Sequence, residues 1–181
     1  MRYGEGLYIG YRWFTARHLE PAVPFGHGLS YASFEWGTPN VTGSQSTDLS
    51  SGIVVEVDVT NTSERSGTEV VQLYIAPPKS TLHRPPIELK GYAKLALEPG
   101  ETKTASITLN FRSFAYFDPG DQFYNTLDAN SPVPRETGSR RTEPGWYAEP
   151  GVYDLVVARS ATNHHAVIEW ELSGEENYQH P

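Results

Sequence analysis

Apolar and polar residues alternate along several short segments of the chain. Between residues 53 and 60, the side chains of Val55, Val57 and Val59 fall on one face of an extended backbone. A second run, between residues 103 and 109, alternates in the same way. A period of two residues is typical of strands that bury one face. These segments therefore predict two half-buried β-strands.

Other segments also have strand patterns, and turn-forming residues separate them. The segment 87–97 predicts either a strand pair or one strand bent at Gly91, and Pro77 ends the strand before it because proline cannot donate to a ladder. Turns are predicted around residues 61–67 and 99–101. The remaining predicted strands cover residues 33–36, 69–76, 152–158 and 166–172, and residues 113–117 form a short aromatic segment. About seven strands at this spacing predict an all-β, immunoglobulin-like antiparallel sandwich over residues 32–173.

Three regions depart from the strand pattern. Residues 1–31 form an N-terminal extension: its part from residue 4 to residue 14 is rich in aromatics and glycine and predicts a short helix or strand. Residues 24–31 predict a rigid loop, because their glycines permit unusual backbone angles. Residues 118–150 predict a long loop or insertion, and the polar residues 174–181 predict a frayed tail.

Composition excludes several classes of protein. The chain has 181 residues, a net charge of −8 and no cysteine, so one domain with extensions is expected and a disulfide framework is excluded. No basic stripe favours nucleic-acid binding, and no apolar run approaches the 18 residues or so of a spanning helix. The first residues contain no export signal, which leaves the cellular location open.

Two motifs at the front of the chain carry a family resemblance. Residues 3–14, YGEGLYIGYRWF, resemble the "YxEGxxxGYR(W/Y)F" segment near the end of the α/β sandwich domain of family 3 glycoside hydrolases, which are mainly β-glucosidases. Residues 24–31, PFGHGLSY, are similar to the "PFGxGLSYT" loop that leaves that domain. This resemblance assigns residues 1–31 to the end of the α/β domain and its linker.

Motifs further along the chain resemble the terminal fibronectin type III-like domain of the same family. They follow in the family's order: EVVQLY at 69–74, ELKGY at 88–92, LEPGE at 97–101 and GVYDLVVA at 151–158. The resemblance covers most of the chain except residues 118–150. It implies that residues 32–173 form a fibronectin type III-like sandwich.

The same resemblance implies where catalysis takes place in the family. It places an aspartate nucleophile on an upstream barrel, in an "SDW"-type motif, and the acid/base residue on the α/β domain. No "SDW" occurs here, so the chain is expected to be a non-catalytic accessory module. The resemblance further implies a parent enzyme that releases sugars from β-glucosides by a two-step retaining mechanism.

Retaining glycosidases need two carboxylates about 5–5.5 Å apart, so acidic residues are the candidate catalytic groups. Asp118 and Asp121 lie in a turn composition, where each can hydrogen-bond its own backbone. Glu5 is interpreted as a capping or ion-pair carboxylate, with Arg12 as a partner, and its alternative is a place beside the parent's substrate cleft. No catalytic residue is therefore assigned to this chain.

Aromatic residues suggest two kinds of contact. Trp146 and Tyr147 are the expected exposed pair, and together with Arg140 and Arg141 they are candidate contacts for carbohydrate or for the catalytic domains. Trp170 alternates with apolar neighbours and is predicted to be core. For docking on the α/β domain the candidates are Tyr8, Tyr11, Trp13, Phe14 and His27.

Three functions remain open from the sequence. The leading one is the accessory module, which stabilises the catalytic domains and shapes the substrate entrance. The second is a carbohydrate- or biomass-binding module, and the third is an oligomerisation module that forms a weak homodimer. The expected partners are the parent's catalytic domains or a polysaccharide, and neither a nucleic acid nor a membrane. No cofactor or metal is expected, because adjacent residues such as His164 and His165 point to opposite faces of a strand.

Overall fold

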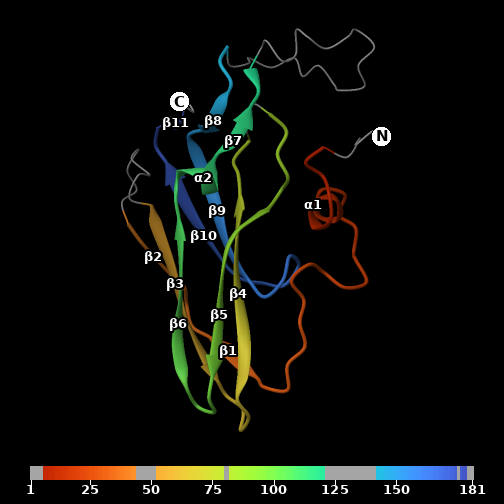
Figure 1. The fold of residues 1–181 in the computed structure, drawn as a ribbon, viewed down its shortest axis with the longest axis vertical. Coiled ribbons are helices and arrows are strands. Elements are labelled where there is room, and N and C mark those ends of the chain that lie inside the picture. The colour runs from red at the N-terminus through yellow and green to blue at the C-terminus, as the bar shows by residue number, and fades with distance from the viewer. Residues whose placement is uncertain (1–5, 44–51, 80–81, 121–141, 175, 179–181) are drawn as a thin grey trace.

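The computed structural model describes residues 6–43, 52–79, 82–120 and 142–174, and the backbone of residues 176–178. Its body is a β-sandwich of two antiparallel sheets (Figure 1). In the first sheet the central strand is β3 (Ile53–Asn61), and β6 (Thr102–Leu109) pairs with one side of it. The short strands β1 (Phe34–Trp36) and β2 (Asn40–Thr42) pair with its other side.

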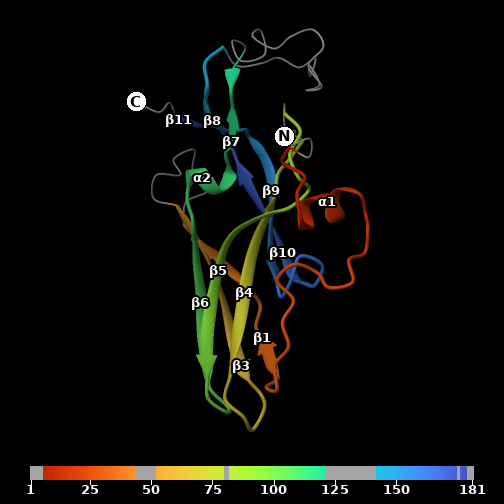
Figure 2. The same cartoon turned by 45° about the vertical axis from the view of Figure 1, so that its right-hand side comes forward.

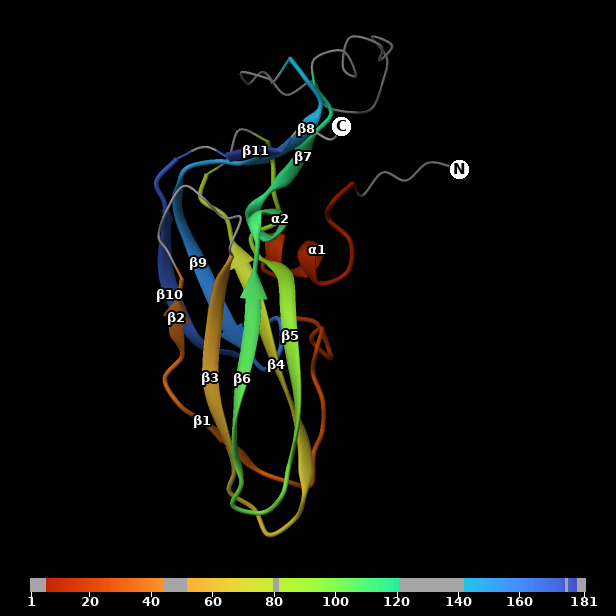
Figure 3. The ribbon, with the colours of Figure 1, turned by 60° about the vertical axis from the view of Figure 1, so that its left-hand side comes forward.

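The second sheet has the order β10-β9-β4-β5. Its strands are β4 (Gly67–Ala76), β5 (Glu88–Leu97), β9 (Gly151–Ala158) and β10 (His164–Leu172). A third, small sheet lies at one end of the sandwich and contains β7 (Tyr116–Asp118), β8 (Gly145–Ala148) and β11 (Glu176–Tyr178), as Figure 3 shows. The helices are α1 (Tyr11–Ala16) and α2 (Phe111–Phe114).

Alternating apolar residues fill the space between the two large sheets. Along β3, Ile53, Val55, Val57 and Val59 are buried, which confirms the face predicted from their spacing. Trp170 is also buried, as predicted, and its ring lies 4.8 Å from that of Phe114. The predicted all-β sandwich is therefore confirmed.

The structure resolves two open points and adds an element to a third. The segment predicted as a strand pair or a bent strand is the single strand β5, whose register against β4 shifts between Leu73 and Tyr74. The segment predicted as helix or strand, residues 4–14, ends inside the six-residue helix α1. Residues 118–150, predicted as a long loop or insertion, contain the strand β8, and residues 121–141 lie outside the described parts.

Residues 6–33, called the strap below, pack on the outer face of the second sheet. Helix α1 lies on the side of that sheet that faces away from the first sheet (Figures 2 and 3). A second, smaller core forms there around Tyr74, Val156 and Ala158, and Tyr11 of the strap packs against it. This outer packing is what positions the site described next.

Candidate functional site

Gln72 of β4 ties the strap to the sheet. Its side-chain amide donates hydrogen bonds to the backbone oxygens of Gly26, at 3.0 Å, and of Arg159, at 2.7 Å. Its amide oxygen accepts a 2.6 Å hydrogen bond from the Tyr74 hydroxyl. The backbone N–H of Ala161 also donates to the oxygen of Phe25. Because Gln72 is buried, these bonds satisfy a polar group that would otherwise be costly to bury.

Two tyrosines of the strap point toward the sandwich. The Tyr11 ring stacks on Phe25, with centroids 4.8 Å apart, and meets the edge of Tyr74. Its hydroxyl accepts a 2.8 Å hydrogen bond from the backbone N–H of Leu89. The Tyr8 hydroxyl donates to the backbone oxygen of Arg84, at 3.3 Å. Burial, and secondarily Tyr11, raise the pKa of Tyr74, so its hydroxyl stays protonated and can donate.

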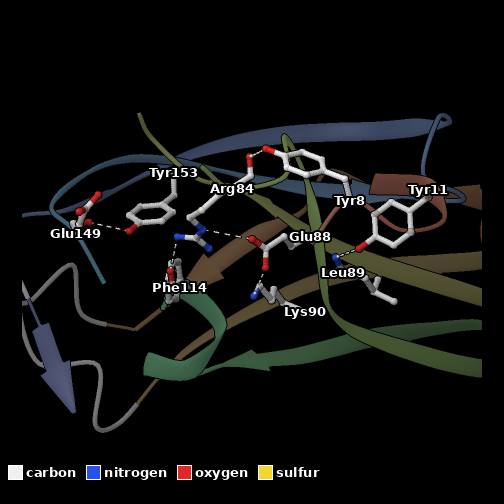
Figure 4. A network of polar contacts seen from close by, with 9 residues as sticks. All are labelled: Tyr8, Tyr11, Arg84, Glu88, Leu89, Lys90, Phe114, Glu149 and Tyr153. Carbon is white, nitrogen blue, oxygen red and sulfur yellow. Dashed lines mark hydrogen bonds and ion pairs between the residues drawn. The ribbon is translucent and has the colours of Figure 1, made fainter. Parts of the chain in front are cut away.

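A buried charge network lies beneath the start of the strap (Figure 4). The Glu88 carboxylate pairs with Lys90, at 2.7 Å, and with the Nε of Arg84, at 3.3 Å. A second guanidinium nitrogen of Arg84, Nη1, donates to the backbone oxygen of Phe114 at 2.8 Å. The third, Nη2, is buried and has no hydrogen-bond partner in the structure.

In this network, burial and the neighbouring charges shift the pKa values of Glu88 and Lys90 in opposite directions. Burial alone would raise the pKa of Glu88, but the charge and hydrogen bond of Lys90, with Arg84 and Arg12, lower it overall. Burial lowers the pKa of Lys90 although Glu88 opposes the change. Burial also raises the pKa of nearby Tyr153 to about 12, and its hydroxyl donates to the backbone oxygen of Glu149. At neutral pH the Glu88 side chain is thus a carboxylate and the Tyr153 hydroxyl is protonated.

A pocket of about 510 Å³ opens beside this network and is called the Arg84 pocket. Both charged residues and aromatic rings line it. Its principal lining residues are Leu7, Arg12, Arg84, Lys90, Phe117 and Trp146. The arrangement combines fixed cationic donors with apolar surface, which is the usual make-up of a small-molecule site.

The strap carries most of the large apolar side chains that are exposed in the described residues. Of the thirteen large apolar side chains that are exposed in the described residues, nine belong to residues 7–31. Leu29 and Tyr31 are 95% and 93% exposed. The nine are Leu7, Ile9, Trp13, Phe14, Leu19, Val23, Phe25, Leu29 and Tyr31. Such a concentration is unusual on the surface of a monomer.

The five residues predicted to dock on another domain divide into two groups. Tyr8 and Tyr11 are half-buried and bind this chain's own sandwich, as described above. Trp13 and Phe14 are exposed, and Arg17 lies over the Trp13 ring at 4.6 Å. His27 is exposed as well. The outward-facing residues remain predicted contacts.

The predicted exposed pair at 146–147 needs a correction. Tyr147 is only 5% exposed, because its side chain points inward and its hydroxyl donates to the backbone oxygen of Glu143. Trp146 is half-buried, with Arg112 3.4 Å from its ring centroid and Phe117 tilted against it. Arg140 and Arg141 lie outside the described residues.

Other sequence candidates have structural explanations. Asp118 is buried, and one of its oxygens accepts a hydrogen bond from the backbone N–H of Gly120, which fits the predicted turn. Asp121 lies outside the described residues. His164 and His165 bond separate backbone oxygens. Within the described parts of the chain, no three metal-ligating side chains cluster.

Sequence reasoning missed the charge network. Glu88 and Lys90 are two residues apart in a strand, so they share a face, and this spacing was a usable signal. Arg84 joins them only through the loop before β5, which no pattern in the sequence indicated.

Neither helix in the described residues is long and apolar enough to cross a membrane.

Comparison with known proteins gives consistent matches. The family model of the fibronectin type III-like domain matches residues 69–161. A β-glucosidase from Rhizobium radiobacter is 39% identical over 172 residues, which are 95% of this chain and 18% of that protein. An exo-α-(1→6)-L-arabinopyranosidase from Bifidobacterium breve is 34% identical over 174 residues, or 96% of this chain and 19% of that protein.

Solved structures agree with the sequence matches. The structure of β-glucosidase 3B from Thermotoga neapolitana, in complex with α-D-glucose, aligns with a TM-score of 0.77 at 28% identity. The alignment covers 97% of this chain and 21% of that one. This chain therefore spans about a fifth of the length of the relatives that it matches.

Proposed function

Because the chain belongs to the fibronectin type III-like domain family and its relatives are family 3 β-glucosidases, we propose that it stabilises the catalytic domains of such an enzyme. In this role the sandwich is an accessory module, and the strap is its docking face. The parent's hydrolysis of β-glucosides by a two-step retaining mechanism belongs to the same proposal. The chain itself contributes no catalytic group to it.

The exposed apolar surface of the strap is the observation that supports this role. Its inner side is fixed to the sandwich by Gln72 and Tyr11, so its outward side chains are held in place rather than free to collapse. Burying apolar area stabilises an association by about 25 cal/mol per Å². Nine large exposed apolar side chains on a strap that is already fixed to the sandwich are well suited to that purpose.

The relatives indicate that the sugar is selected elsewhere in the enzyme. Chains similar to this one occur both in proteins named β-glucosidase and in one named exo-α-(1→6)-L-arabinopyranosidase. A module shared by enzymes with different sugars does not by itself determine the sugar. We therefore assign this module to stability and to shaping the substrate entrance.

The experiment uses the β-glucosidase of Rhizobium radiobacter, truncated to remove the region that matches this chain. The truncated enzyme is mixed with this chain, and its half-life at elevated temperature is measured by hydrolysis of an aryl β-glucoside. We expect the chain to bind the truncated enzyme and to lengthen the half-life several-fold. The chain alone should give no hydrolysis above the blank.

Two variants make the test specific. Leu29→Ser with Tyr31→Ser removes apolar area from the docking face and should abolish the gain in half-life. Tyr92→Ser removes an aromatic ring that is 68% exposed but lies outside the strap, and it should leave the gain intact. The proposal fails if both variants behave alike, if the chain does not bind the truncated enzyme, or if repurified chain hydrolyses the glucoside.

A further inference from the structure

The chain contains two Asn-X-Ser/Thr triplets, the acceptor sequence for N-linked glycosylation. The first starts at Asn40 and ends at Thr42, and the second starts at Asn61 and ends at Ser63. A glycan is bulky and hydrophilic, so it requires an asparagine on the surface of the folded chain, with its side-chain amide free. The sequence does not separate the two triplets, but their structural environments differ.

Asn40 and Thr42 both point away from the core. They are the end residues of the short strand β2, and Val41 between them packs against the main core. Because successive side chains of a strand alternate between its two faces, Asn40 and Thr42 share the outer face of the first sheet. Both are exposed, and within the described parts of the chain the Asn40 side chain makes no hydrogen bond. Its amide nitrogen is therefore accessible.

The Asn61 side chain is fully engaged in the folded chain. Asn61 is 0% exposed, and its Nδ2 donates to the backbone oxygens of Arg65, at 2.7 Å, and Leu97, at 3.1 Å. Its Oδ1 accepts hydrogen bonds from the backbone N–H and the hydroxyl of Ser63. A sugar on Nδ2 would replace one of the two donated hydrogens inside the protein and leave a buried oxygen unpaired. A chain modified at Asn61 is thus incompatible with this fold.

We propose that Asn40 is the N-glycosylation site of this chain and that Asn61 is not one. The donor is a lipid-linked oligosaccharide, in a cell that exports the protein through a compartment containing it. Nδ2 of Asn40 forms a bond to C1 of the first sugar, and the bond from C1 to the pyrophosphate oxygen breaks. The lipid pyrophosphate leaves, and the amide releases one proton. Thr42 completes the acceptor triplet on the same face of β2.

A glycan at Asn40 leaves the strap free to dock. The strap packs on the outer face of the second sheet, whereas Asn40 lies on the outer face of the first sheet, on the opposite side of the sandwich (Figure 3). Among the described residues, β2 pairs only with β3, so it is an edge strand. A glycan on it would shield that edge from pairing with other chains. The inference does not depend on the docking role.

The test expresses the intact chain behind a secretion signal in a eukaryotic host that glycosylates exported proteins. The folded, secreted chain is purified, and its glycans are removed by an amidase in heavy-oxygen water, which converts each glycosylated asparagine to a labelled aspartate. Mass spectrometry of the peptides then locates the label. We expect it at Asn40 in most molecules and not at Asn61. Secreted, folded chain without a glycan at Asn40, or with one at Asn61, would overturn the proposal.

Matched variants locate the acceptor. Thr42→Ala removes the hydroxyl of the triplet and leaves Asn40 in place, so it should abolish the glycan without changing the circular dichroism spectrum. Thr38→Ala makes the same substitution at an exposed residue outside the triplet and should keep the glycan. Loss of the glycan in both variants, or its retention in Thr42→Ala, would contradict the assignment.

Discussion

At the scale of single residues, buried polar side chains hold separate segments of the chain together. Gln72 connects the strap to β4, and Asn61 connects a turn to β5 by donating to the backbone oxygens of Arg65 and Leu97. Asn61 is fully buried and ends β3, where the predicted turn at 61–67 begins. In each case a single side chain satisfies several backbone groups, so substituting it leaves more than one of them unpaired.

Gly26→Ala tests the tie between Gln72 and the strap. Gly26 has a φ of +81°, and a Cβ there would collide with the Gln72 amide, which cannot move without losing its hydrogen bonds. We expect a loss of about 2 kcal/mol in the free energy of unfolding, measured with urea. Gly28→Ala is the control, since nothing lies within 4 Å of its Cβ position. Equal losses in both variants would refute the argument.

Glu88→Gln tests the charge network through its pH dependence. The pKa of Glu88 is lowered on folding, so its charge stabilises the fold above the unfolded value of about 4.3 and this contribution is lost as the pH falls through the lower folded value. At pH 7 the variant should lose roughly 3 kcal/mol, because Arg84 and Lys90 keep their charges without the carboxylate. The difference from wild type should shrink below about pH 4.3 in urea unfolding curves. A difference that is constant from pH 7 to pH 3 would count against this account.

At the scale of elements, sequence patterns predicted the long strands and the short strand β1 but missed several other short ones. The alternation over 53–60 became β3, but β2, β8 and β11 have only three or four residues each, too few for a period to be recognised. The pattern of the strap was equally ambiguous, because α1 has only six residues. The strap's role was predicted from family motifs, whereas the Arg84 network depends on tertiary contacts between a loop and β5.

Arg159→Lys tests how the short strand β1 is held against the second sheet. Arg159 donates to Glu69, at 2.7 Å, and to the backbone oxygen of Phe34, at 2.9 Å, and it lies 4.3 Å from the Trp36 ring centroid. Lysine keeps the charge but cannot make this forked, stacked set of contacts. We expect a loss of about 2 kcal/mol in thermal or urea unfolding. The exposed Arg65→Lys is the control, and an equal loss there would show that Arg159 has no special role.

At the scale of the whole molecule, the chain has two apolar cores that differ in size and in the segments that build them. The main core between the sheets draws all its residues from position 34 onward. The smaller core, on the outer face of the second sheet, is covered by Tyr11 of the strap. The strap is therefore a layer that shields one apolar face of the sandwich and presents another, so weak self-association of the chain on its own is expected.

Removal of residues 1–33 separates the two cores. The sandwich should still fold, since its main core is intact, but Tyr74, Val156 and Ala158 would lose their cover. Each large apolar side chain that returns to water costs about 1.5–3 kcal/mol, so we expect a loss of roughly 4 kcal/mol in urea unfolding and stronger binding of a hydrophobic dye. Removal of residues 1–7 keeps Tyr8, Tyr11 and Phe25 and should cost far less. Equal stability of the two truncated chains would show that the strap is not a structural layer, whereas a chain starting at residue 34 that cannot fold would show that the two cores form one unit.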